Sequence, residues 1–232
     1  MRRRNDDPII SLIILGVIVV IAVASYFISN LRRKKRTEAL ERAAGELGLI
    51  FSPQGNDYLV NQLSWCELFS RGRSKKVLNL MRGSNEGREI SLFDYQYVTG
   101  HGKSRRTVCS TVACLRADGP PLPAFTLRPE GTWDKISKLF RSADIDFDTH
   151  PNFSRSFMLR GDDESAVRTI FAPAVLEYFE QRSGISAEGS SDTLVLYRSS
   201  KKVPPDGVNQ FLADAFGALS LFRAEPRPGV RS

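Results

Sequence analysis

The sequence predicts an α+β fold: an N-terminal transmembrane helix followed by an antiparallel, sheet-rich domain with three to four packed helices. Two observations predict it. The 20 uncharged residues from Ile9 to Ile28 would, as a helix, span the roughly 30 Å hydrocarbon core of a bilayer. Beyond them, short segments of alternating apolar residues are separated by turns rich in Gly, Ser and Asn, a pattern typical of antiparallel strands.

These patterns divide the chain into five expected segments: an N-terminal tail at 1–8, a transmembrane helix at 9–31, a basic juxtamembrane helix at 32–48, a soluble α+β domain at 49–222 and a disordered tail at 223–232. The juxtamembrane helix is predicted because apolar residues recur at helical spacing up to Leu47, and Gly48 is suited to end it. The last segment has too few apolar residues to be held in a core.

The apolar segment is predicted to remain in the membrane. The alternative is a cleaved signal peptide, because Ala22-Val23-Ala24 has the A-x-A form of a cleavage site. Against cleavage, two acidic residues interrupt the basic N-terminal region, and a run of cations would follow the cut, where it opposes export. These membrane-flanking cations are Arg32, Arg33, Lys34, Lys35 and Arg36. Because such charge stays inside, the soluble domain is expected in the cytoplasm behind a single span.

Charge and cysteine content narrow the functional classes. The net charge is +7, yet eight of the 33 basic residues flank the apolar segment, which leaves 25 Lys and Arg against 24 Asp and Glu from Thr37 onward. The soluble domain is therefore almost neutral, and nucleic acid is not an expected partner. The odd number of cysteines, three, favours free thiols in a reducing compartment.

Strands and helices are predicted from their different apolar periods. An antiparallel meander is expected over 57–60, 65–69, 77–82, 89–98 and 106–115, with further strands at 123–130, 155–160, 185–188 and 193–198. Helices are expected at 131–141, where Thr132 caps a stretch that buries Trp133, and at 162–183, with a kink at Pro173. A last helix at 206–222 carries one continuous apolar stripe.

The stretch GHGKS at 100–104 resembles part of a phosphate-binding loop. That loop follows the pattern G-x-x-x-x-G-K-[ST] between a strand and a helix, so that backbone N–H groups converge on the phosphates. Here Tyr97 occupies the position five before Gly102, and the residues RRTVCSTVACL that follow predict a strand. The glycines are instead expected in a turn between antiparallel strands, and neither a nucleotide nor another cofactor is predicted.

The segment DIDFDTH at 144–150 is the candidate metal site. In an extended conformation its polar side chains would share one face, with neighbours about 7 Å apart, close enough for a hard cation to recruit two of them. These candidate ligands are Asp144, Asp146, Asp148 and His150. As a calcium loop the segment lacks Gly at the sixth position and Glu at the twelfth. The favoured alternative is a solvated strand edge that buries the apolar residues between the acids.

Two other features carry weaker hypotheses. Asp94 lies among apolar residues of the strand 89–98, so it is expected to be either a perturbed acid or base or, preferably, a structural partner of Arg82 or Arg106 on an adjacent strand. Three predicted loops, at 70–76, 100–106 and 198–202, are basic. If they gather on one side they are expected to contact an anionic lipid surface; the alternative is ordinary solvated turns.

Four phrases carry a resemblance over roughly residues 37–222: ISLFDYQYVTGHGK, LPAFTLRPE, DIDFDTHPNFSRSFMLRGDDESAVRTIF and TLVLYR. With them the chain resembles a family of uncharacterised bacterial single-span membrane proteins with a soluble α+β domain. The resemblance implies an anchored domain at a bacterial inner (plasma) membrane. It transfers no catalytic or binding residue to this sequence.

No acid, base and nucleophile converge in the sequence, so the function expected first is non-enzymatic. It is that of an interaction or regulatory domain with a protein partner of unknown identity, anchored in the lipid bilayer through residues 9–28. Two alternatives stay open. One is a pleckstrin-like module that binds lipid surfaces, suggested by many strands followed by an amphipathic helix. The other is a metal-dependent hydrolase that uses the acidic segment 144–150.

Overall fold

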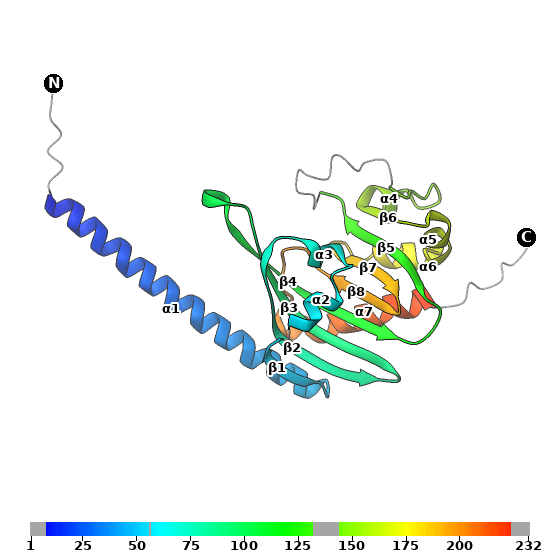
Figure 1. The fold of residues 1–232 in the computed structure, drawn as a ribbon, viewed down its shortest axis with the longest axis horizontal. Coiled ribbons are helices and arrows are strands. Elements are labelled where there is room, and N and C mark those ends of the chain that lie inside the picture. Colours follow the sequence, from blue (N-terminus) through cyan, green and yellow to red (C-terminus); the bar gives the residue numbers. More distant parts are fainter. Residues whose placement is uncertain (1–7, 56, 132–143, 224–232) are drawn as a thin grey trace, which may run out of the picture. The chain divides into compact units, whose positions relative to one another are not determined.

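A computed structural model describes residues 8–55, 57–131 and 144–223, which form two compact units, residues 1–40 and 41–232 (Figure 1). Helix α1 (Pro8–Glu46) makes up the first unit and continues into the second. From Leu12 onward it is long and apolar enough to cross a membrane. Its side chains from 12 to 28 are exposed, as expected for groups that meet lipid rather than a protein core.

The end of α1 matches the prediction at Gly48. This glycine has a φ of +67°, in the left-handed region that lacks a steric penalty only for glycine. The Leu49 N–H donates to the Ala44 carbonyl at 2.8 Å, and the Gly48 N–H donates to the Gly45 carbonyl at 3.1 Å. This pair of bonds is the Schellman motif, which satisfies carbonyls at the end of a helix and redirects the chain into the sheet.

The second unit is built on an eight-stranded sheet in the order β1-β2-β3-β4-β8-β7-β5-β6, in which every neighbouring pair is antiparallel. The strands are β1 (Ile50–Gln54), β2 (Arg73–Asn85), β3 (Arg88–Thr99), β4 (Arg106–Ala117), β5 (Leu122–Pro129), β6 (Phe157–Gly161), β7 (Ser186–Ser191) and β8 (Thr193–Tyr197). The predicted α+β class is confirmed. The described sheet is open, with β1 and β6 at its edges, so it is not the closed barrel that a pleckstrin-like module requires.

Helices cover both faces of this sheet (Figure 1). The front face carries the side chains of Phe93, Val112 and Tyr197, and α2 and α3 pack against it. The back face carries Phe125 and Leu127, and the remaining helices lie against it. The helix bounds are α2 (Asp57–Gln62), α3 (Glu67–Ser70), α4 (Pro151–Ser156), α5 (Glu164–Ile170), α6 (Pro173–Glu180) and α7 (Val208–Arg223), with single turns η1 (Gly102–Ser104) and η3 (Pro205–Gly207).

Two glycines flank Phe125 in the row of cross-strand neighbours on the back face, Gly161 on β6 and Gly189 on β7. A Cβ added at Gly189 would lie 2.2 Å from the Phe125 ring. Gly189→Val is therefore expected to lower the free energy of unfolding by about 1–3 kcal/mol through overpacking. Gly45→Ala, whose Cβ meets nothing within 4 Å, is the control and is expected to cause no loss. Urea unfolding followed by circular dichroism measures both.

The structure corrects several sequence predictions. Residues 57–60 and 65–69 are not strands but belong to or adjoin the short helices α2 and α3, because Leu59, Leu63 and Cys66 recur at helical spacing and are buried against the front face. Strand β1 was not predicted. The strand expected at 155–160 starts at Phe157, since α4 occupies the residues before it. The helix expected at 131–141 lies outside the described residues, apart from its first position.

Candidate functional site

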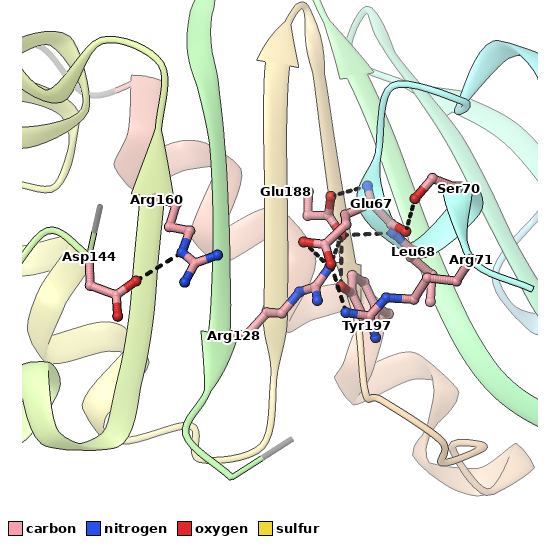
Figure 2. A network of polar contacts seen from close by, with 9 residues as sticks. All are labelled: Glu67, Leu68, Ser70, Arg71, Arg128, Asp144, Arg160, Glu188 and Tyr197. Carbon is pink, nitrogen blue, oxygen red and sulfur yellow. Dashed lines mark hydrogen bonds and ion pairs between the residues drawn. The ribbon is translucent and has the colours of Figure 1, made fainter. Parts of the chain in front are cut away.

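A buried carboxylate lies on the front face, between β7 and α3 (Figure 2). Glu188 on β7 is 1% exposed. Its carboxylate accepts hydrogen bonds from the backbone N–H groups of Glu67 and Leu68, at 2.5 and 3.2 Å, and from the Tyr197 hydroxyl at 2.7 Å. Those N–H groups belong to the first turn of α3, where they have no partner within the helix. Glu188 thereby ties α3 to the sheet.

Arg128 on β5 supplies the countercharge. Its guanidinium Nη2 lies 2.6 Å from a Glu67 carboxylate oxygen and 3.5 Å from Glu188, and the residue is 3% exposed. Glu67 also accepts from Arg71 at 2.8 Å. Positive and negative side chains therefore alternate in contact order: Arg71, Glu67, Arg128 and Glu188. In this arrangement each buried ion lies beside an ion of opposite charge. We call these four residues and Tyr197 the ionic network.

Burial suppresses the nucleophiles near this network. Burial, reinforced by the neighbouring Glu188 carboxylate, raises the pKa of the Cys66 thiol well above its ordinary value. The same two causes raise the pKa of Tyr197. Both groups therefore stay protonated near neutral pH, whereas nucleophilic attack by a cysteine requires the thiolate. The ionic network joins segments of the fold and offers no activated nucleophile.

The three thiols are expected to differ in reactivity. Burial raises the pKa of Cys114 to about 12, and Cys66 is completely buried, whereas Cys109 is only partly buried. A disulfide reagent such as dithiobis(nitrobenzoate) at pH 8 is expected to modify Cys109 quickly in the native protein and the other two only after denaturant is added. Peptide mass spectrometry identifies the modified residues. Rapid native modification of Cys66 would contradict the packing described here.

Asp94 forms a second buried polar group, and its partners differ from those predicted. It accepts from Asn79 at 3.0 Å and Thr111 at 2.9 Å, and Lys202 lies 3.6 Å away. A register shift in β2 next to Asn79, whose φ is +51°, marks a bulge that turns this side chain toward Asp94. Arg82 and Arg106, the expected partners, occupy cross-strand rows whose side chains point to the opposite face. Asp94 fastens β2, β4 and the segment after β8.

The predicted metal ligands are not brought together on one face. Ile145 is buried and its N–H donates to the Leu159 carbonyl on the edge strand β6 at 2.8 Å, and 148–149 form a turn. Asp144 is paired with Arg160 at 2.9 Å (Figure 2), and His150 contacts the Thr149 hydroxyl. Asp146 and Asp148 are exposed. Within the described ranges, no three His, Cys, Asp or Glu side chains are grouped closely enough to hold a metal ion.

The stretch GHGKS forms the turn between antiparallel β3 and β4, as predicted, and the single turn η1 lies within it. The structure also brings the three basic loops to one end of the sheet. Arg73 pairs with Val98 next to this turn, and the Ser200 N–H donates to the Ser110 hydroxyl on β4. These loops, 70–76, 100–106 and 198–202, contain ten Lys and Arg and no acid. We call them the basic end.

The cations of the basic end fall into an engaged group and an available group. In the engaged group, Arg71 pairs with Glu67, Lys202 pairs with Asp94, and Lys75 donates to the Phe69 carbonyl. Five others are exposed and form no ion pair with the residues that the structure describes: Arg73, Lys76, Lys103, Arg105 and Lys201.

At the opposite end of the sheet a pocket of about 480 Å³ opens between α2 and the front face. One cross-strand row runs through it: Ile50 on β1, Arg82 on β2, Ser91 on β3 and Cys114 on β4. Residues of α2 and the turn after it form the apolar wall. The remaining lining residues are Tyr58, Leu59, Gln62, Leu63, Gly83, Ser84, Glu89, Ile90 and Arg116.

Sequence reasoning missed both the ionic network and the pocket. A signal for the network is present, because Glu188 and Arg128 interrupt strand segments that are otherwise apolar or small. Such charges are buried only when they are paired. The pocket was missed because 57–60 and 65–69 were predicted as strands joined by a turn, so the helix that forms the pocket wall was not expected.

Comparison with known proteins gives one informative likeness. Neither the family models nor the curated protein sequences match this chain. Among solved structures, the chain is similar to the mycobacterial trehalose monomycolate transport factor A, TtfA, with a TM-score of 0.55 and 12% sequence identity. The likeness covers 83% of this chain and 98% of that one. At this identity it shows a shared fold.

Proposed function

We propose that the chain is a non-catalytic interaction module, tethered by α1 to the inner membrane of a bacterium, with residues 41–232 in the cytoplasm. The proposal is based on one observation: the buried charged residues bind segments of the fold to one another. Glu188 and Arg128 fasten α3 to the sheet, and Asp94 fastens the segment after β8. Five exposed cations that form no ion pair with the described residues gather at the basic end, which is suited to recognition rather than to bond cleavage.

The structural neighbour supports an accessory role. It is named a trehalose monomycolate transport factor, and the likeness covers 98% of the solved chain. We extend to this chain only a membrane-associated, non-catalytic role. The separate engagements of Asp144 and His150 count against the metal-dependent hydrolase alternative.

Site-specific photocrosslinking tests this proposal. A photoreactive amino acid replaces Lys103, which lies exposed in the β3–β4 turn, in full-length protein expressed in cells. The expected result is a discrete protein adduct of higher mass. The matched control is the same substitution at Glu86, exposed in the β2–β3 turn at the other end of the sheet, which is expected to give no adduct. Equal crosslinking from both positions, or from neither, contradicts an interaction surface at the basic end.

An anionic lipid surface is the second candidate, favoured by the five exposed, unpaired cations of the basic end. Each such cation near an anionic leaflet contributes about 1 kcal/mol. A soluble fragment starting at Thr37, with its folded state verified by circular dichroism, is expected to sediment with phosphatidylglycerol vesicles and not with phosphatidylcholine vesicles. Arg73→Glu combined with Lys103→Glu is expected to abolish sedimentation. Equal binding to both lipids contradicts this candidate.

A further inference from the structure

The pocket at the β1 end carries an unusual amount of exposed apolar surface. Ile50 is 78% exposed and Tyr58 is 58% exposed, and they stand at the pocket, while Leu59 and Leu63 behind them are buried. Burying apolar surface of this kind contributes about 25 cal/mol per Å². The described residues leave this surface in water, although the pocket lies within the size range of small-molecule sites.

The two arginines at the pocket differ in whether they have a carboxylate partner. Arg116 is neutralised by Asp192 at 3.1 Å and by Glu89 at 3.6 Å. Arg82 forms no ion pair or side-chain hydrogen bond with any residue in the described part of the chain. It shares its row with Ser91, whose hydroxyl lies on the next strand. One guanidinium and one hydroxyl are therefore available to an anionic group, beside an apolar wall. Guanidinium groups bind carboxylates and phosphates in this way.

We propose that this pocket binds a single-chain anionic amphiphile: one acyl chain that lies against Ile50, Tyr58 and Leu63 and ends in a carboxylate or phosphate held by Arg82 and Ser91. A volume of about 480 Å³ is too small for both chains of a membrane phospholipid. The proposal does not depend on the partner at the basic end.

Photoaffinity labelling in membranes tests the proposal. The full chain, reconstituted in bilayers, is exposed to three probes with the same diazirine-bearing chain: a fatty acid, a lysophosphatidic acid and a fatty alcohol. Labelled peptides are then mapped by mass spectrometry. We expect one or both of the anionic probes to label residues 50–63 or 82–91 and the alcohol to label them much less. The stronger anionic probe distinguishes carboxylate from phosphate as the preferred head group.

Two variants test whether the labelling depends on the pocket. Arg82→Glu is expected to reduce anionic labelling of the pocket about tenfold, because a hydrogen-bonded charge pair is lost. Ile50→Asn is expected to reduce labelling by every probe. Arg105→Glu, the same charge change at the basic end, is the matched control and is expected to leave labelling unchanged. Labelling confined to residues 9–28 shows partition into the bilayer alone and overturns the proposal. Pocket labelling that is insensitive to Arg82→Glu, or equal for the alcohol, overturns the anionic head group.

Discussion

Replacing Glu188 with alanine is expected to lower the free energy of unfolding by about 3–5 kcal/mol, the usual cost of removing one member of a buried ion pair. The substitution leaves the N–H groups of Glu67 and Leu68 and the Tyr197 hydroxyl without their acceptor. It also leaves the Arg128 guanidinium, 3% exposed, with a single carboxylate. Urea unfolding of the soluble fragment that starts at Thr37, followed by circular dichroism, measures the change.

Two further substitutions make this result interpretable. Glu188→Gln keeps the shape and one acceptor oxygen, so its loss is expected to be smaller than that of the alanine variant. Glu164→Ala removes an exposed carboxylate that pairs with Arg168 on the surface of α5, and its effect is expected to be below about 1 kcal/mol. If Glu188→Ala cost no more than Glu164→Ala, the ionic network would not be what holds α3 on the sheet.

Phe179→Ala is expected to have an effect of similar size, about 3–5 kcal/mol, for a different reason. The Phe179 ring is fully buried, and the rings of Phe157, Phe171 and Phe222 lie 6.1 to 6.5 Å from it, centroid to centroid. Alanine would leave a cavity where α6, α7 and β6 meet, and these aromatic neighbours cannot all collapse into it.

The control for this cavity is Phe179→Leu, which keeps most of the side-chain volume. Its cost is expected to be near 1 kcal/mol, because only the ring contacts and a small volume are lost. The same urea measurement applies. Equal losses for the alanine and leucine variants would indicate that the site collapses freely and that the back-face aromatic cluster is not closely packed.

Local sequence patterns correctly predicted long elements such as α7, in which one apolar face packs against the rest of the domain. The stripe of α7 is buried as expected at Phe211, Ala215 and Leu219. Strands β2, β3 and β4 include the predicted segments 77–82, 89–98 and 106–115. The same reasoning was wrong for 57–60 and 65–69, because segments of four to six residues are too short to show whether their apolar period is that of a strand or of a helix. Leu59 and Leu63 then fit a strand and a helix equally well, and packing against the sheet decided between them.

The candidate site was less predictable because its residues meet only through the fold. Glu67 and Glu188 are 121 positions apart, and Arg128 lies between them in sequence. Asp94 was recognised as a buried acid, but its partner Asn79 depends on a bulge that shifts the register of β2 by one residue. The charges of Glu188 and Arg128 within apolar strands indicate that each needs a partner, but nearby residues identify neither that partner nor the bulge.

The proposed function requires that α1 remains in the membrane with residues 41–232 on the cytoplasmic side. Labelling with a membrane-impermeant maleimide in intact spheroplasts tests this directly, with Lys103→Cys or Asn5→Cys introduced into a Cys109→Ser chain. With this orientation, Asn5→Cys, in the N-terminal tail, is expected to be labelled at once and Lys103→Cys only after permeabilisation. Labelling of Lys103→Cys in intact spheroplasts would contradict it.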